Sequence, residues 1–224
     1  SSSAASDVYK RQVHEIKAPI TAIALNCENN RDERSRYLLV ENRKVENYVD
    51  MALYYARMDA VYKDYMIAES NLQEVAQQVL LQNKYYLIQS HVKAEVACPD
   101  TVYSDKKWIA FILNQLIQNS VKYGRSEGTH IQIVTKKTKR GVLLRVKDDG
   151  IGIPKEEIPR IFEKGFTGTN GRNRERSTGM GLYLCRKLCD KLNIEIRAES
   201  AEGKGTEIIL MFPVSDYLTG YRET

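Results

Sequence analysis

"GVLLRVKDDGIGIP", residues 141–154, is the stretch on which the fold depends. Its first eight residues largely alternate apolar and polar side chains, which is typical of a β-strand with one buried face. Gly150 and Gly152 follow and allow a tight turn that a ligand can approach closely. The Asp148 carboxylate, where the strand ends, can accept a hydrogen bond from an exocyclic amine such as that of adenine. A D-x-G-x-G turn is weak by itself, since most such stretches are ordinary turns.

The segments on both sides of this stretch alternate between strand and helix patterns. Residues 130–137 form a second alternating run and predict a hairpin with it. Further strands are expected at 92–97, 194–199 and 206–213, and helices at 71–88, 105–123 and 180–192. Helices beside runs of strands predict an α+β sandwich with the helices on one face of a mixed sheet. Residues 150–178 are too long for an ordinary connection, so we expect a functional loop there.

The N-terminal part follows a purely helical pattern. Apolar residues recur every three or four positions from Val13 to Cys27 and again from Leu38 to Ala56, on either side of a polar break. We therefore expect a helical hairpin. Two helices cannot bury both apolar stripes by themselves, and a second copy would complete a four-helix bundle. The pattern thus predicts a homodimer.

The expected organisation of the chain has five segments. Residues 1–12, a low-complexity run followed by "DVYKRQ", are interpreted as a non-native leader. The others are the hairpin at 13–60, a linker at 61–68, the sandwich at 69–215 and a tail at 216–224.

Composition narrows the class of protein. The 224 residues carry a net charge of +5 at pH 7, too mild and dispersed to suggest a nucleic-acid surface. No run approaches the roughly 20 apolar residues that a membrane helix needs, although an anchor could precede residue 1. The four cysteines lack the paired spacing of a zinc site, and a chain of this size needs no disulfides, so a reducing cytoplasm fits best.

Two helix motifs suit a nucleotide. "NQLIQNSVKY", residues 114–123, leaves Asn119, Lys122 and Tyr123 on one polar side of a helix. An amide oxygen can ligate Mg²⁺, and a lysine can meet a phosphate. "STGMGLYLC", residues 177–185, places glycines before a helix, where free N–H groups favour a phosphate. Taken singly, the first stretch is better explained by a solvated helix face.

Two loop features also suit a nucleotide. The segment from Lys164 to Arg176 holds four basic residues against one acidic residue, which suits a polyphosphate. "GKGTEIIL", residues 203–210, turns tightly into a strand. A basic solvated loop and a hairpin turn are the plain alternatives.

In this order the motifs resemble the N, G1, F, G2 and G3 boxes of sensor histidine kinases, from Val13 to about Pro213, and "HEIKAPI" resembles the H box. Within that family, "VYSDKKWIAFILNQLIQNSVKY" looks like the group that senses antimicrobial peptides such as bacitracin beside a partner ABC transporter. The resemblance implies the Bergerat ATP-binding fold, shared with gyrase and mismatch-repair ATPases, and the use of ATP and Mg²⁺. Consistently, the sequence contains no Walker P-loop motif.

The resemblance also implies roles for individual residues. Asp148 would bind the adenine amine, and Asn119 would ligate Mg²⁺. Lys122 would contact phosphate, and Tyr123 would pack on the base. The other residues that it assigns to the pocket, its floor and its lid are Gly150, Gly152, Phe162, Lys164, Phe166, Arg172, Arg176, Thr178, Gly179, Met180, Gly181, Leu182 and Thr206.

His14 would be the phosphoryl acceptor, and Glu15 would orient or deprotonate its ring. An imidazole with an ordinary pKa of about 6.5 is largely neutral at cytoplasmic pH and therefore nucleophilic. A metal site is less favoured, because no second ligand lies three or four positions after His14. The phosphohistidine would pass its phosphoryl group to an aspartate of a response regulator, and the chain would be the cytoplasmic portion of a membrane protein.

Three residues depart from the expected pattern. Ala18 stands where the family commonly has Thr or Asn to position water, which puts phosphatase activity in question. Gln115 stands where many relatives carry a further asparagine. Pro19 removes one helical hydrogen bond, so we predict a local kink. Two other functions remain open: a gyrase-like or mismatch-repair ATPase without an acceptor histidine, and a degenerate module that binds a regulator without ATP.

Overall fold

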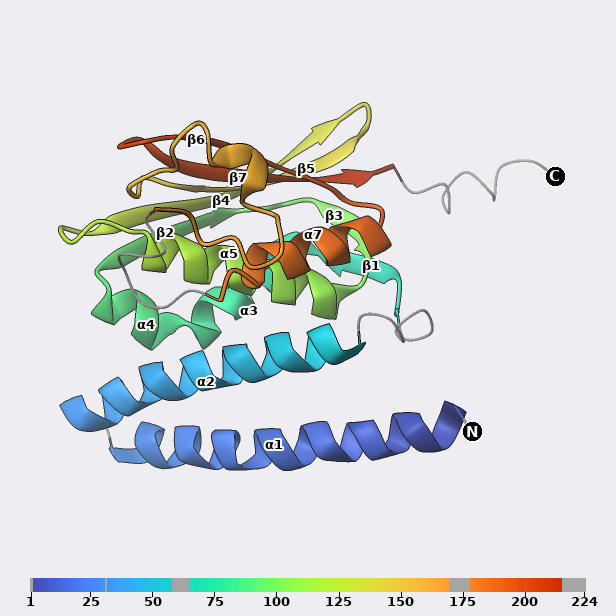
Figure 1. Cartoon of the computed structure of the whole chain (residues 1–224), viewed down its shortest axis with the longest axis vertical. Helices are drawn as coiled ribbons and strands as arrows, with labels where there is room; N and C mark the ends of the chain where they lie inside the picture. The colour runs from blue at the N-terminus through green and yellow to red at the C-terminus, as the bar shows by residue number, and fades with distance from the viewer. Residues whose placement is uncertain (1, 31, 58–64, 170–177, 215–224) are drawn as a thin grey trace. The chain divides into compact units, whose positions relative to one another are not determined.

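The computed structural model describes residues 2–30, 32–57, 65–169 and 178–214. The chain divides into two compact units, residues 1–62 and 63–224, and each is described by itself. The first unit is the predicted helical hairpin, formed by α1 (Ser2–Asn30) and α2 (Glu33–Arg57) (Figure 1). Because α1 begins at Ser2, it includes most of the segment interpreted as a leader.

Polar contacts join the two helices near the middle of α1. The Lys17 ammonium lies 2.6 Å from the Asp50 carboxylate, and the Asn42 amide donates to the Ile20 carbonyl at 2.9 Å. The helix continues through Pro19, and Figure 1 shows no sharp bend in it, which counts against the predicted kink. Pro19 and Glu15 are both exposed, so water can satisfy the carbonyl that the proline leaves without a helical donor.

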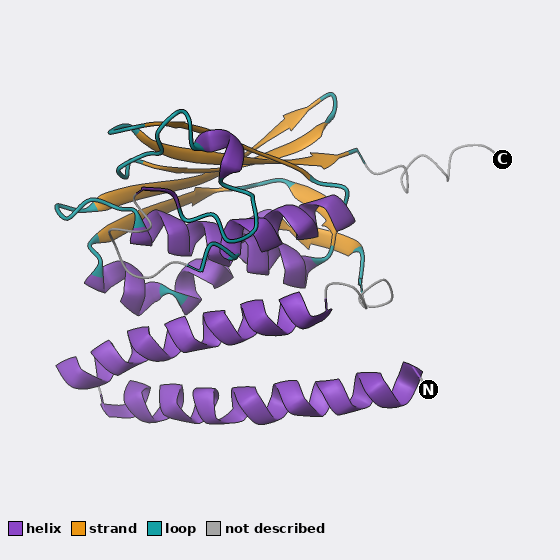
Figure 2. Ribbon diagram, in the orientation of Figure 1, coloured by secondary structure: helices purple, strands orange, loops and turns teal. Residues whose placement is uncertain are grey.

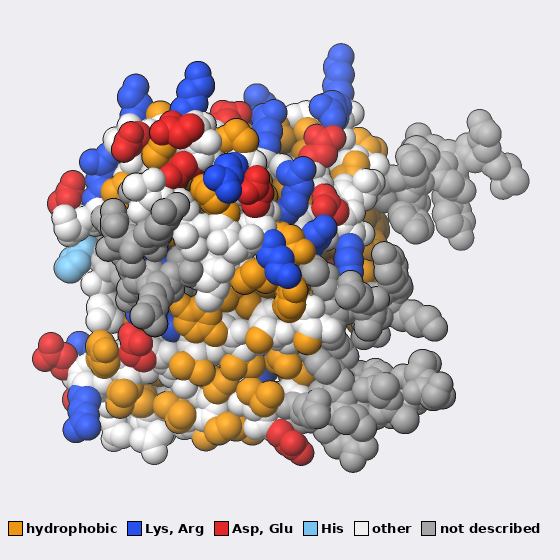
Figure 3. Space-filling view, viewed as in Figure 1, with side chains coloured by type: hydrophobic (Ala, Val, Ile, Leu, Met, Phe, Trp, Pro, Cys, Tyr) orange, Lys and Arg blue, Asp and Glu red, His pale blue; other side chains and the backbone are white. Residues whose placement is uncertain are grey.

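The apolar stripes of the hairpin are only partly buried. Ile20 and Cys27 are buried, but Ile23 is 49% exposed and Val45 on α2 is 50% exposed. Ile16 and Leu38 are exposed as well. Figure 3 shows apolar side chains gathered over the helices of the hairpin. One copy of the hairpin therefore leaves apolar surface in contact with water, as expected for half of a larger bundle.

The second unit is built on a mixed sheet of five strands (Figure 2). The central strands β4 (Thr129–Thr138) and β5 (Gly141–Asp148) form the predicted hairpin. The strand order is β2–β4–β5–β7–β6, in which β2 runs parallel to β4 and the other neighbours are antiparallel. The edge strands are β2 (Val92–Ala97) and β6 (Glu195–Ala201), and β7 (Gly205–Pro213) lies between β5 and β6.

Three helices cover one face of this sheet: α3 (Leu72–Gln82), α5 (Lys106–Lys122) and α7 (Gly181–Lys191) (Figure 1). The middle helix, α5, supplies Ile109, Leu113 and Ile117, which are fully buried. From the sheet, Ile131 and Leu144 are equally buried. Truncating one such side chain to alanine costs about 2–5 kcal/mol, so this layer fixes the position of α5 against the sheet.

Two details differ from the predicted elements. The helix expected over residues 71–88 breaks at Asn83 into α3 and α4 (Lys84–Gln89). The Asn83 side chain, 1% exposed, donates to the carbonyl of Val79 at 2.8 Å. The structure also adds a small antiparallel sheet of β1 (Ala68–Asn71) and β3 (Thr101–Ser104), which the sequence pattern did not predict.

Candidate functional site

A cavity opens between α5, the ends of β5 and β7, and the loop that follows β5. Seven of its lining residues were predicted to hold the nucleotide: Asn119, Tyr123, Asp148, Gly152, Phe166, Leu182 and Thr206. Apolar side chains such as Leu116, Val146 and Ile208 line it as well. A mostly apolar cavity with a few polar groups is the usual form of a small-molecule site.

Asp148 is the buried acidic group of this cavity, with 9% of its surface exposed. Its Oδ1 accepts hydrogen bonds from the backbone N–H groups of Gly150, at 3.0 Å, and Thr206, at 3.2 Å. Its Oδ2 accepts one from the Ser120 hydroxyl, at 2.8 Å. Each carboxylate oxygen can accept about two hydrogen bonds, so Oδ1 is saturated and Oδ2 keeps room for one more donor.

The electrostatic state of Asp148 follows from this environment. Burial raises the pKa of Asp148 above its usual value, and neighbouring Asp149 acts in the same direction. The hydrogen bonds from Ser120, Gly150 and Thr206 oppose the rise because they stabilise the carboxylate. An additional donor from a ligand would stabilise the ionised form further, so the site favours a ligand with an N–H group.

The polar residues of α5 reach the cavity as predicted, with one exception. Asn119 and Tyr123 line it, and among the described residues the Asn119 side-chain amide has no hydrogen-bond partner. Its oxygen is thus available, which fits a Mg²⁺ ligand. Lys122 is not among the lining residues, and its ammonium lies 5.9 Å from the Tyr123 ring centroid.

Glycines let the turns around the cavity approach each other. A Cβ on Gly150 would lie 2.5 Å from the Tyr123 carbonyl oxygen. Gly152 has φ of +71°, and a Cβ there would lie 2.0 Å from the Ala201 carbonyl oxygen. Gly150 is therefore required for its lack of a side chain, and Gly152 both for its conformation and for its lack of a side chain.

The loop after β5 brings some of its predicted residues to the cavity and leaves others outside. Phe166 lines the cavity, and the Arg160 guanidinium lies 4.6 Å from the centroid of its ring. Phe162 lies outside the lining, 5.7 Å from the guanidinium carbon of Arg186. Lys164 is exposed. Arg172 and Arg176 fall outside the described residues.

The predicted glycine motif before α7 forms the other end of this loop. The Gly179 carbonyl accepts a hydrogen bond from the Gly165 N–H at 3.0 Å, which joins the middle of the loop to its end before α7. Met180 is the N-cap residue and Gly181 the first residue of α7. The hydroxyl of Thr178, which is exposed, accepts a hydrogen bond from the Met180 N–H at 3.3 Å.

Among the lining residues that the sequence did not predict, Ser120 and Glu157 form side-chain hydrogen bonds. Ser120 follows Asn119 on α5, and only its contact with Asp148 gives it a role. Glu157 lines the cavity, and its carboxylate accepts hydrogen bonds from the Thr169 N–H, at 2.8 Å, and hydroxyl, at 2.6 Å. Neither residue stands out in the sequence, because a serine inside a helix and a glutamate in a charged loop are common.

His14 and Glu15, the predicted acceptor and its helper, belong to the other unit. Both are exposed on α1, where a protein or nucleotide partner can reach them. Among the described residues, no helix is long and apolar enough to cross a bilayer.

Residues 104–216, from the end of β3 to beyond β7, match the family described as "Histidine kinase-, DNA gyrase B-, and HSP90-like ATPase". The chain belongs to this ATPase family. The match includes every residue that lines the cavity. The α+β class and the predicted ATP-binding sandwich are thereby confirmed.

Proteins that are similar to the chain include sensor kinases. Sensor protein kinase GraS of Staphylococcus aureus (strain JH1) is 36% identical over 210 residues, which are 91% of this chain and 59% of GraS. The chain thus spans about three fifths of the length of this relative.

Solved structures support the fold. The Acinetobacter baumannii histidine kinase AdeS is similar with a TM-score of 0.62 at 20% identity, over 90% of this chain and 98% of AdeS. Histidine kinase ThkA in complex with response regulator protein TrrA gives a TM-score of 0.59 at 21% identity, over 94% of this chain and 62% of that one. Both likenesses extend over the hairpin as well as the sandwich, since each covers nine tenths or more of the chain.

Proposed function

We propose that this chain is the kinase portion of a sensor histidine kinase. It would transfer the γ-phosphoryl group of ATP to His14 and pass it to an aspartate of a response regulator. The observation that carries the proposal is the buried Asp148 carboxylate, which keeps one acceptor position open toward the cavity of a chain from an ATPase family. The similarity to GraS, a sensor kinase by name, supports the choice among the activities of the family.

The lining of the cavity supports nucleotide binding. Oδ2 of Asp148 would accept the adenine amine, and the Tyr123 ring would pack against the base. Gly150 and Gly152 would keep the turn close to it. The Asn119 amide oxygen would hold Mg²⁺, which neutralises charge on the phosphates when bound. Lys122 would contact phosphate from the same helix.

Phosphoryl transfer then depends on His14 and Glu15. A ring nitrogen of His14 would attack the γ-phosphorus in line with the leaving oxygen. The N–P bond would form as the bond to ADP breaks, and ADP would leave with the electron pair. Glu15, next to His14, would orient the ring or accept its proton. The exposure of both residues on α1 is consistent with this role.

The partners form part of the same proposal. The exposed apolar surface of the hairpin supports a homodimer that completes a four-helix bundle. A response regulator is supported by the ThkA–TrrA complex, in which a similar kinase binds such a protein. A membrane location and an ABC transporter partner are proposed only from the family resemblance.

Radiolabelled ATP separates this proposal from the ATPase alternative. With Mg²⁺, label from the γ-position should become covalently bound to the protein, whereas label from the α-position should not. Chelation of the metal should abolish the transfer. Release of free phosphate with no label on the protein would instead favour a non-kinase ATPase, and the absence of nucleotide binding would favour the degenerate module.

A further inference from the structure

Three turns meet behind the cavity at the end of α5 that carries Tyr123. One follows α5 at Tyr123, the second contains Asp148–Gly152, and the third joins β6 to β7. The Ile151 N–H donates to the Tyr123 carbonyl at 3.0 Å, and the Gly203 N–H donates to the Ile151 carbonyl at 2.7 Å. The position of the Asp148 turn thus depends on both of its neighbours.

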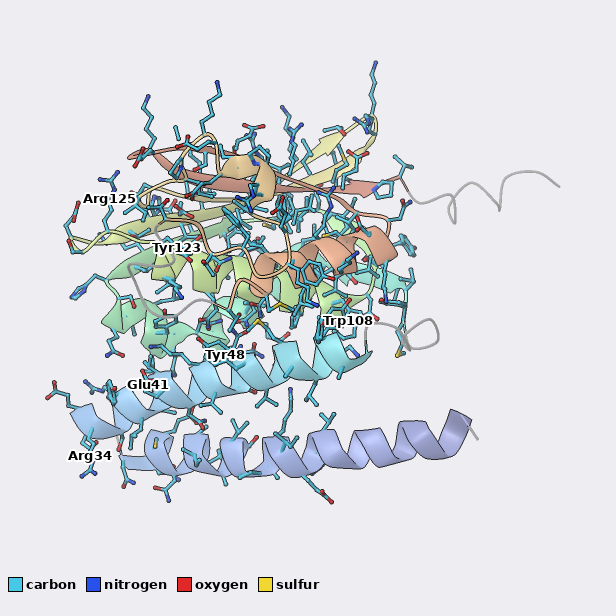
Figure 4. All side chains as sticks on the ribbon, in the orientation of Figure 1. Arg34, Glu41, Tyr48, Trp108, Tyr123 and Arg125 are labelled. Carbon is cyan, nitrogen blue, oxygen red and sulfur yellow. The ribbon has the colours of Figure 1, made fainter. Side chains whose placement is uncertain are left out.

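The Arg125 side chain bridges two of these turns. Its Nε donates to the Asp149 carbonyl at 2.7 Å, and its Nη2 donates to the carbonyl of Gly203. Asp149 directly follows Asp148, and Gly203 lies in the β6–β7 turn. The Arg125 guanidinium therefore holds the turn that contains Asp148 against the turn between β6 and β7. Figure 4 labels Tyr123 and Arg125 at the end of α5 opposite Trp108.

A backbone contact of Arg125 fixes the position from which its side chain extends. The Arg125 N–H donates to the Thr129 hydroxyl at 2.8 Å, and Thr129 is 4% exposed at the start of β4. A Cβ on Gly124 would lie 2.4 Å from that hydroxyl, so the glycine permits the contact. The Glu127 carboxylate also lies 4.0 Å from Arg125 Nη1. Arg125 is therefore attached to the sheet at its backbone and to both turns at its side chain.

We propose that Arg125 is a positioning residue for the nucleotide, acting through the Asp148 turn. It is not among the residues that line the cavity, so it sets the geometry of the site without touching the ligand. The inference rests on the proposed nucleotide site. It adds to that site a residue that none of the family motifs includes.

The chemistry explains why arginine is needed. A guanidinium presents several N–H donors in a fixed planar fork, so it can reach two carbonyl oxygens at once. A lysine ammonium is a compact point charge on a flexible stem and cannot reproduce that fork. The Arg125→Lys variant therefore keeps the charge while losing the bridge. It separates the bridging geometry from simple electrostatic attraction to phosphate.

Titration calorimetry with ATP, ADP and adenosine tests the proposal. Arg125→Lys should raise the dissociation constant about three- to tenfold, as loss of a hydrogen bond predicts. The factor should be the same for all three ligands, because the turn serves the adenine end. The number of sites should stay unchanged. Arg140→Lys is the matched control. Arg140 lies in the turn between β4 and β5, and its exposed side chain forms an ion pair with Glu195 at 3.0 Å.

Three results would overturn the inference. The first is a dissociation constant for Arg125→Lys within twofold of the wild type. The second is a lower number of sites at unchanged affinity, which is the sign of partial unfolding. The third is a loss confined to ATP, which would mean direct contact with phosphate. Wild-type protein that binds ATP but carries no phosphoryl label would refute the kinase activity and leave the Arg125 result standing.

Discussion

At the scale of single residues, the asymmetry of the Asp148 carboxylate matters most. Oδ1 is fixed by two backbone donors that cannot rotate away, while Oδ2 faces one hydroxyl and the cavity. An asparagine at this position must therefore keep its oxygen toward Gly150 and Thr206. Its NH₂ group would replace Oδ2, and the Ser120 hydroxyl can turn to accept from it. A ligand amine would then meet a donor where it needs an acceptor.

Asp148→Asn should accordingly separate binding from stability. We expect nucleotide affinity to fall at least about tenfold, since a mismatched buried hydrogen bond costs about 1–3 kcal/mol. The free energy of unfolding without ligand should be equal or higher at neutral pH, because the variant buries no charge. Calorimetry and thermal unfolding measure the two effects. Retained affinity, or a loss of several degrees in Tm, would contradict this account.

The raised pKa of Asp148 makes the free energy of unfolding depend on pH. The pKa of Asp148 is raised above 3.8 in the folded chain, so the stability contributed by this group is fully present below about pH 3.8. That contribution is lost as pH rises through the folded pKa. The stability difference between Asp148→Asn and wild type should therefore shift in favour of the variant from about pH 4 to about pH 7. Denaturant unfolding across this range would show a constant difference if burial had no effect.

At the scale of elements, turns with glycines at positive φ hold the cavity together. Gly152 and Gly203 make a matched pair, with φ of +71° and +75°. A Cβ on Gly203 meets nothing within 4 Å, whereas one on Gly152 would lie 2.0 Å from a backbone oxygen. A side chain in place of Gly203 would strain only the backbone conformation. A side chain in place of Gly152 would strain the conformation and also clash with the backbone.

Alanine at these two positions should consequently differ in effect. Gly203→Ala should lower the free energy of unfolding by about 1–2 kcal/mol, the cost of a left-handed conformation for a residue with a Cβ. Gly152→Ala should lower it clearly more and weaken nucleotide binding as well. Urea unfolding of both variants measures this. Equal losses would show that the close approach to Ala201 does not matter.

The hairpin is the other element with a testable surface. Ile23 is 49% exposed on α1, so burial against a second copy should contribute to association. Ile23→Glu should shift the protein toward the monomer in light scattering at micromolar concentration. Asn29→Glu, which adds the same charge at an exposed position of the same helix, is the control. A wild-type chain that is monomeric throughout would refute the predicted dimer.

Sequence periodicity was enough for the elements with strong patterns and failed for the short ones. The hairpin β4–β5, α5 and α7 follow clear two-residue or helical repeats and were predicted. The strands β1 and β3 have four residues each, too few for a period, and they exist because they pair with each other. The break at Asn83 depends on a buried contact with Asn114, 31 residues away, which no local pattern contains.

At the scale of the whole molecule, the proposed function involves both units. The proposed nucleotide cavity belongs to the second unit, and the exposed His14 belongs to the first. The order of motifs along the chain predicted this division, because each motif marks a turn or helix end with its own residues. The order of motifs could not predict contacts between distant segments. The roles proposed for Ser120, Glu157 and Arg125 depend on such contacts.

The phosphoryl acceptor is the most direct test of the central claim. After incubation with γ-labelled ATP and Mg²⁺, the wild-type chain should carry label that is lost in acid and stable in alkali. His14→Gln should abolish that label, whereas His91→Gln and His130→Gln should retain it. Undiminished label in His14→Gln would contradict the account.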